Sequence, residues 1–193
     1  MTLESRILLV LQKYEEKLHK DRIANNILTE YENAFGFTLS TRVGSRAFNN
    51  TFGYLIEEIL LCSSNIKKAE REYDFESEKI LYECKSKFNT VKGSDLFSTL
   101  QKKINLANRL NKKFYYIVIV DKKNESRKMP LGKFCKKIET LSEYSPKKNK
   151  FISGDKVYRH FFGNDWRLVK NLLLGFLKKC GEEKSSDFFP KCL

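Results

Sequence analysis

The chain has 193 residues and a net charge of +13, and 41% of its residues are hydrophobic. This length and composition predict one compact domain over residues 1–193 and exclude a disordered tail, and the sequence contains no apolar run of membrane-spanning length. Five scattered cysteines without Cys-x-x-Cys spacing argue against structural zinc and a disulfide framework, and no signal peptide is recognisable, so we expect a cytoplasmic protein.

The charge is unevenly distributed along the chain. Residues 1–100 contain 14 Lys/Arg and 15 Asp/Glu, whereas residues 101–193 contain 23 and 9. An excess of positive charge attracts polyanions and gives an affinity that depends on salt. We therefore expect a nucleic-acid partner and no membrane, although charge alone also fits a basic protein that binds ribosomes or a membrane surface.

Two helices are predicted at the N-terminus, followed by a polar segment. Apolar residues recur at helical spacing from Leu3 to His19, and a second helix is expected from Ile23 to Phe35; both would pack outside the core or supply a dimer surface. The segment from Phe37 to Asn50 contains Arg42 and Arg46, which are residues of the type that contacts phosphates and base edges. They are candidate DNA-binding residues, and an ordinary surface loop explains them equally well.

The next predicted helix carries candidate acidic residues. Five apolar residues at helical spacing predict one buried stripe: Phe52, Leu55, Ile56, Ile59 and Leu60. Glu57 and its neighbour Glu58 lie on the same helix. The alternative is that both glutamates are ordinary solvent-exposed residues at the edge of the helix and have no part in a site.

The most informative segment is a predicted hairpin over residues 73–88. Its residues alternate with the period of a strand, with Ile80, Tyr82 and Cys84 on one face and Leu81, Glu83 and Lys85 on the other. The polar residues 76–79 form a connection of hairpin length, which brings Asp74 close to Glu83 and Lys85. Two carboxylates can hold a divalent metal, and a nearby ammonium can steady developing negative charge. The alternative is an exposed strand face with an ion pair to Asp74.

A helix and a buried strand are predicted after the hairpin. The helix runs from Ser94, its expected N-cap, to Leu110, and its apolar face consists of Leu96, Phe97, Leu100, Ile104, Ala107 and Leu110. The continuous apolar run from Phe114 to Val120 is typical of a strand that is buried on both faces.

The remaining sequence is strongly basic. Residues 122–150 contain ten Lys/Arg and three acidic residues, so we expect the main electrostatic contact with DNA here. The candidate contacts are Lys122, Lys123, Arg127 and Lys128, together with Lys87 at the end of the hairpin strand. A short helix is predicted from Gly132 to Leu141, and an apolar helix from Arg167 to Lys179.

Asp74, followed after eight residues by Glu83-Cys84-Lys85, resembles the D…E-x-K core of the PD-(D/E)XK nuclease superfamily, which includes many type II restriction endonucleases. Glu72-Tyr73 stand where the proline of the motif and its neighbour would be. The predicted elements follow the α-β-β-β-α-β order of that core. The resemblance implies an α/β fold with a central mixed sheet of four to five strands flanked by helices. It divides the chain into a helical extension and loop (1–50), a catalytic core (51–120), and basic loops with a C-terminal helix (121–193).

The resemblance also implies a chemistry. Asp74 and Glu83 would bind Mg²⁺, for which Mn²⁺ is expected to substitute, with a share from the Cys84 carbonyl. Lys85 would position the attacking water and offset negative charge, and Glu57 or Glu58 would be an outer ligand. The implied protein is a homodimeric type II restriction endonuclease that hydrolyses a short specific site in double-stranded DNA. The alternatives are a repair or nicking nuclease or a Holliday-junction resolvase of the same fold, and a non-catalytic basic nucleic-acid-binding protein.

Overall fold

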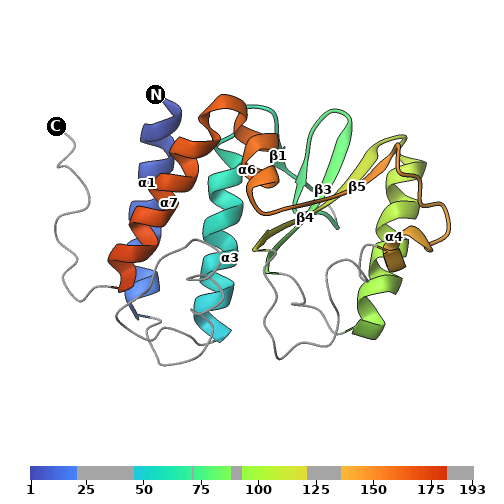
Figure 1. Ribbon diagram of the computed structural model, residues 1–193, viewed down its shortest axis with the longest axis horizontal. Coiled ribbons are helices and arrows are strands. Elements are labelled where there is room, and N and C mark those ends of the chain that lie inside the picture. The colour runs from blue at the N-terminus through green and yellow to red at the C-terminus, as the bar shows by residue number, and fades with distance from the viewer. Residues whose placement is uncertain (21–45, 71, 88–92, 121–135, 182–193) are drawn as a thin grey trace. The chain divides into compact units, whose positions relative to one another are not determined.

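The computed structural model describes residues 1–20, 46–70, 72–87, 93–120 and 136–181 (Figure 1). These residues group into two compact units, one drawn from residues 1–64 and 158–193 and the other from residues 65–157. Within the described ranges, no helix is both long and apolar enough to span a membrane. The proposed division of the chain into a helical extension, a catalytic core and basic loops stays a prediction.

The first unit is helical and is built from α1 (Leu3–Lys20), α3 (Arg46–Leu61) and α7 (Trp166–Gly181). α1 packs against both of the other helices (Figure 1). Its inward face consists of residues spaced three or four apart that are almost inaccessible to solvent: Ile7, Leu11, Tyr14 and Leu18. The helices predicted over residues 3–19 and 167–179 are therefore confirmed.

The stripe predicted on the helix of Glu57 is also confirmed. Phe52, Leu55, Ile56, Ile59 and Leu60 are each at most 1% exposed. The prediction that the polar loop extends to Asn50 is wrong at its C-terminal boundary, because α3 already begins at Arg46. Phe48 stands four residues before Phe52 in the sequence, so the helical spacing of apolar residues extends one turn further back than predicted.

The second unit contains a five-stranded sheet in the order β1-β2-β3-β4-β5. Its strands are β1 (Lys67–Lys68), β2 (Phe75–Glu76), β3 (Ile80–Lys87), β4 (Lys113–Val120) and β5 (Asn149–Ser153). The pairs β1–β2 and β2–β3 are antiparallel, whereas β3–β4 and β4–β5 are parallel. This mixed sheet confirms the predicted α/β fold class.

The predicted hairpin is formed by β2 and β3. Phe75 pairs with Tyr82 and Glu76 pairs with Leu81, so Glu76 belongs to the strand and the turn is three residues long rather than four. Ser77 closes this turn, because its backbone N–H donates to the Ile80 carbonyl at 2.8 Å and its hydroxyl accepts from the Ile80 N–H at 3.1 Å.

α4 (Gly93–Arg109) connects β3 to β4 and packs on one face of the sheet. The core between them contains five of the residues predicted for the helix face, Leu96, Phe97, Leu100, Ile104 and Ala107, with Leu81, Phe114, Tyr116 and Val118 from the strands. The prediction that Leu110 belongs to the buried helix face is wrong, because Leu110 lies beyond the helix and is 45% exposed. The helix ends there because Asn111 adopts φ 52°, and the N–H groups of Asn111 and Lys112 donate to the carbonyls of Asn108 and Ala107.

β4 is buried on both faces, as its sequence predicts, since residues 114–119 are each at most 5% exposed. Four of the described elements were not predicted: β1, β5, α6 (Asp155–Phe162) and the short 3-10 helix η1 (Gly163–Asp165). The helix predicted for residues 23–35 lies outside the described residues. Of the helix predicted for residues 132–141, the described part is helical at 136–139.

Candidate active site

The hairpin brings three of the predicted site residues together. Asp74 immediately precedes β2, and its Oδ2 accepts a hydrogen bond from the Cys84 backbone N–H at 2.6 Å. Glu83 and Lys85 lie two residues apart on β3 and therefore on the same face of the sheet. The Lys85 Nζ lies 2.5 Å from the Glu83 Oε1. A carboxylate pair with an adjacent ammonium thus forms on the β2–β3 hairpin, where Asp74 lies beside β3.

Glu83 is buried, with 7% of its surface exposed. It projects from the face of the sheet that α4 covers, and each of its oxygens pairs with a lysine: Oε1 with Lys85 and Oε2 with Lys103 of α4. The alternative of an exposed strand face is therefore wrong for Glu83. Burying charged groups carries a large desolvation cost. This cluster therefore differs from an ordinary ion pair on a solvated strand face.

The two carboxylates affect each other electrostatically. Burial, and then repulsion from Glu83, raises the pKa of Asp74, although Lys85, the Cys84 N–H and Lys103 act to lower it. Burial acts to lower the pKa of Lys85, but the attraction of Glu83 and Asp74 outweighs it, and the pKa is raised overall. Lys85 is therefore protonated at neutral pH, and a further cation beside the carboxylates would relieve their mutual repulsion.

Lys103 contacts the candidate site and was not identified from the sequence. Its buried ammonium donates to Glu83 Oε2 and to the Glu72 backbone carbonyl, and it lies 5.2 Å from the centre of the Tyr73 ring. The Tyr73 hydroxyl donates in turn to the Lys103 carbonyl at 2.6 Å. The sequence does contain a feature that could have identified it. Lys103 lies three residues after Leu100, on the apolar face of the helix, where a lysine needs a buried partner.

The donor set on this hairpin suits a hard divalent cation. The Asp74 and Glu83 carboxylates and the predicted Cys84 carbonyl are all oxygen donors, which Mg²⁺ prefers over nitrogen and sulfur. In the part of the chain that the structure describes, no three His, Cys, Asp or Glu side chains form a metal-binding group. A cation held by the Asp74 and Glu83 carboxylates would take its remaining ligands from other groups, such as backbone carbonyls, water and a bound phosphate.

The two candidate carboxylates on α3 differ in their surroundings. Glu58 accepts hydrogen bonds from Lys13, at 2.6 and 2.9 Å, and from the Tyr14 hydroxyl at 2.8 Å, and so links α3 to α1. Burial acts to raise the pKa of Glu58, but these two partners lower it overall. Glu58 thus has a structural role within the helical unit. The role of Glu57 as an outer metal ligand stays a prediction.

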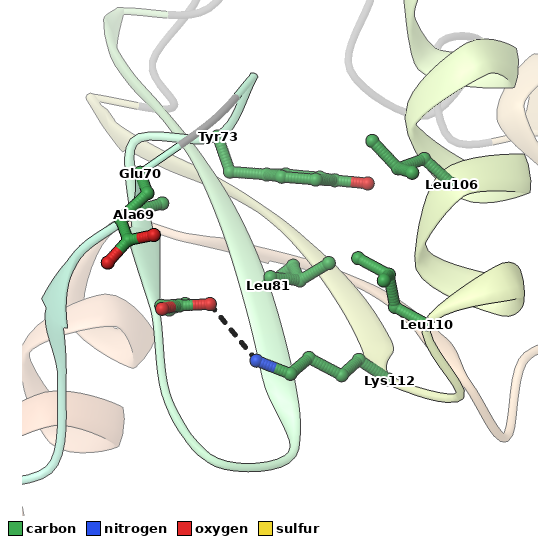
Figure 2. Close-up of a pocket in the computed structure, with 8 residues that line it drawn as sticks. Ala69, Glu70, Tyr73, Leu81, Leu106, Leu110 and Lys112 are labelled. Atoms are coloured by element: carbon green, nitrogen blue, oxygen red, sulfur yellow. Dashed lines mark hydrogen bonds and ion pairs between the residues drawn. The ribbon is translucent and has the colours of Figure 1, made fainter.

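A second cluster of charge lies beside a pocket of about 240 Å³ on the same hairpin (Figure 2). The pocket is lined by Tyr73, Leu81, Leu106 and other residues between the hairpin and the end of α4. The Glu76 carboxylate at this pocket lies 3.0 Å from both Lys112 Nζ and Lys67 Nζ. Of the described residues that line the pocket, none is Asp74, Glu83 or Lys85, so the pocket is separate from the candidate active site.

The predicted DNA-binding residues are not described by the structure. Arg42, Lys122, Lys123, Arg127 and Lys128 lie outside the described ranges. Arg46 begins α3 and Lys87 ends β3, but the positions of their side chains are likewise outside them. All seven stay predictions.

Comparison with known proteins relates the chain to a family of restriction enzymes. The family model described as Eco47II restriction endonuclease matches residues 21–172, which include α3, the hairpin, α4 and the whole sheet. No curated protein and no solved structure matches the chain.

Proposed function

The chain belongs to the Eco47II restriction endonuclease family, and from this premise we propose that it is a Mg²⁺-dependent type II enzyme that cuts a short specific site in double-stranded DNA. The proposal assigns the reaction to the part of the β2–β3 hairpin that carries Asp74, Glu83 and Lys85. Family membership makes the protein a DNA endonuclease. The metal, the specificity and the residues of the reaction belong to the proposal.

The observation that carries the proposal is the buried charge of Glu83. A glutamate that is 7% exposed and pairs with two lysines, and that is close enough to Asp74 to raise the pKa of Asp74, is costly for a fold to maintain. A pair of carboxylates in which burial and the neighbouring charge raise the pKa of one member is typical of functional sites. The same pair supplies the oxygen ligands that a phosphodiesterase needs.

We assign metal binding to Asp74 and Glu83, with a share from the Cys84 carbonyl. A divalent cation bound there would supply Lewis acidity toward a phosphoryl oxygen and favour the ionisation of water. The hydrogen bond from the Cys84 N–H holds the Asp74 carboxylate against β3, and the contacts of Lys85 and Lys103 hold that of Glu83. Both carboxylates are thus oriented by the protein before any substrate arrives.

Lys85 acts as a cation in this account and not as a general base. Its raised pKa, which the two carboxylates cause against the effect of burial, keeps a proton on Nζ at neutral pH. A protonated amine can donate hydrogen bonds to the attacking water and to the scissile phosphate. It thereby offsets the negative charge that develops in the transition state.

We also propose that the enzyme works as a homodimer. Cutting both strands of a palindromic site requires two active centres related by a twofold axis. The described residues of the chain contain one such hairpin. The basic residues 122–150, with ten Lys/Arg against three acidic residues, would supply attraction to the DNA backbone.

The proposal is tested by incubating the protein with plasmid and phage DNA in Mg²⁺ and in EDTA, beside the Lys85→Ala variant. We expect discrete fragments that require both the metal and Lys85, while Lys85→Ala still binds DNA in Ca²⁺. End-mapping of the fragments would give the recognition sequence, and sedimentation would give the oligomeric state. Nicked circles or cleaved four-way junctions alone would indicate a nicking nuclease or a resolvase, and tight metal-independent binding without cleavage would contradict the proposal.

A further inference from the structure

Lys103 contacts both parts of the hairpin that carry the proposed metal ligands. Its ammonium donates to the Glu83 carboxylate on β3 and to the Glu72 carbonyl, two residues before Asp74. The Tyr73 side chain also contacts Lys103, since its ring is 5.2 Å from the ammonium and its hydroxyl donates to the Lys103 carbonyl. One side chain of α4 therefore fixes the segment before Asp74 relative to Glu83.

The two oxygens of Glu83 have different partners. Lys103, whose side chain is 9% exposed, binds Oε2, and Lys85, whose side chain is 24% exposed, binds Oε1. Rotation of the carboxylate is restricted because both of its oxygens are bound.

The same contacts make the cluster electrically neutral. Asp74 and Glu83 contribute two negative charges, and Lys85 and Lys103 contribute two positive charges. A buried charge acts strongly on a neighbour because little water screens it. A divalent cation that binds to the two carboxylates must therefore bind against the repulsion of both ammonium groups.

We propose that Lys103 is a positioning residue for the metal site, which orients Glu83 and the Asp74 segment for the reaction while it weakens the affinity of the two carboxylates for a divalent cation. This inference rests on the proposed function, because it takes Asp74 and Glu83 as the metal ligands. It predicts two effects of opposite sign when the charge of Lys103 is removed. The cation binds more tightly, and the reaction becomes slower.

The test compares two substitutions of Lys103 with a matched control on the same helix. Lys103→Met keeps the length of the side chain but removes both the charge and the donor, and Lys103→Gln removes the charge but keeps a donor. Lys102→Met makes the same change in charge at the adjacent, exposed position. Binding of Ca²⁺ without DNA is followed by calorimetry and by the Ca²⁺-induced rise in Tm, and cleavage is measured at saturating Mg²⁺.

We expect both Lys103 variants to bind Ca²⁺ about tenfold or more tightly than the wild type, since a full charge in direct contact with Glu83 is removed. The maximal cleavage rate should fall about tenfold or more in Lys103→Met and less in Lys103→Gln, because the amide can still orient the carboxylate. Lys102→Met should change neither quantity. If Lys103→Met does not fold without metal, Lys103→Gln carries the comparison.

Ca²⁺ affinities in the Lys103 variants that are equal to or weaker than that of Lys102→Met would overturn the inference, as would an unchanged maximal rate. Failure of the proposed function gives a different result, because the wild-type protein would then neither bind the cation nor cut DNA. A wild type that binds Ca²⁺ and cuts DNA, with Lys103 variants indistinguishable from the control, refutes the role of Lys103 alone.

Discussion

Two glutamates of the same hairpin each pair with two lysines, and the differences between them separate a structural ion cluster from the candidate active site. Glu76 of β2 pairs with Lys67 and Lys112, and Glu83 of β3 pairs with Lys85 and Lys103. The side chain of Glu76 is 19% exposed and that of Glu83 is 9% exposed. Because each cluster consists of one glutamate and two lysines, the residue types alone do not distinguish the two clusters.

The distinguishing feature is the second carboxylate. Hydrogen bonds from Lys112 and Lys67 lower the pKa of Glu76, as expected for an acid that is surrounded by cations. At the other cluster, burial and repulsion from Glu83 raise the pKa of Asp74 in spite of two nearby lysines. The cations around Glu76 thus stabilise its ionised form, whereas the ionised form of Asp74 is unfavourable beside Glu83, and a cation bound to both carboxylates would relieve their mutual repulsion.

The largest expected difference is in how much the free energy of unfolding falls when the charge of each glutamate is removed. Glu83→Gln leaves two lysines without their carboxylate, one of them buried, and should lower the free energy of unfolding by about 3–5 kcal/mol. Glu76→Gln should cost about 1 kcal/mol or less, because its lysines remain more exposed to water. Urea unfolding in EDTA measures both values. Equal losses would show that the burial of Glu83 does not distinguish the two clusters.

A smaller effect is expected at Tyr73, which lies between the clusters. Its hydroxyl makes a buried hydrogen bond to the Lys103 carbonyl at 2.6 Å, so Tyr73→Phe should lower the free energy of unfolding by about 1 kcal/mol. Tyr54, which is 60% exposed, provides the matched control, and Tyr54→Phe should have no measurable effect. Urea unfolding of both variants tests the contact, and equal stabilities would argue against it.

The smallest effect is a pH dependence of stability with opposite signs at the two clusters. The raised pKa of Asp74 means that its ionised form destabilises the fold above that pKa, and this penalty disappears as the pH falls below the ordinary value of 3.8. Asp74→Asn should therefore raise Tm at neutral pH, with a gain that vanishes in acid. The lowered pKa of Glu76 contributes stability above its ordinary value of 4.5, which is lost as the pH falls through the lowered pKa.

Glu76→Gln should accordingly lower Tm at neutral pH, with a loss that also vanishes in acid. Tm values of both variants and the wild type, measured in EDTA from neutral pH to below about pH 4, give the two differences. Differences of the same sign would contradict the assignment of one cluster as structural and the other as a site.

The sequence predicted the parts of the site that depend on local periodicity. Strand alternation predicted that Glu83 and Lys85 lie on one face, and the short polar connection predicted that Asp74 lies close to them. Both inferences match the hairpin. Helical spacing likewise predicted the buried stripe of α3 and most of the buried face of α4. Each of these features is set by neighbours that lie within a few residues along the chain.

Features that depend on distant partners were not predicted. Lys103 appears as an irregularity on an apolar helix face, and its partner Glu83 lies twenty residues earlier, a pairing that only the packing of α4 on the sheet determines. β5 has two apolar residues, Phe151 and Ile152, next to the lysine-rich residues 147–150, so charge obscured its pattern. Its strand character comes from parallel pairing with β4.

The central claim is tested most directly by the Mg²⁺-dependent cleavage rates of Asp74→Asn and Glu76→Gln, measured side by side on the same DNA. Asp74→Asn should lose about 10²–10³-fold in rate while it still folds and binds DNA in Ca²⁺, because it removes a charged metal ligand. Glu76→Gln should cut within about threefold of the wild-type rate, since it alters only a structural ion cluster. Equal losses in both variants, or cleavage by Asp74→Asn at the wild-type rate, would contradict the account.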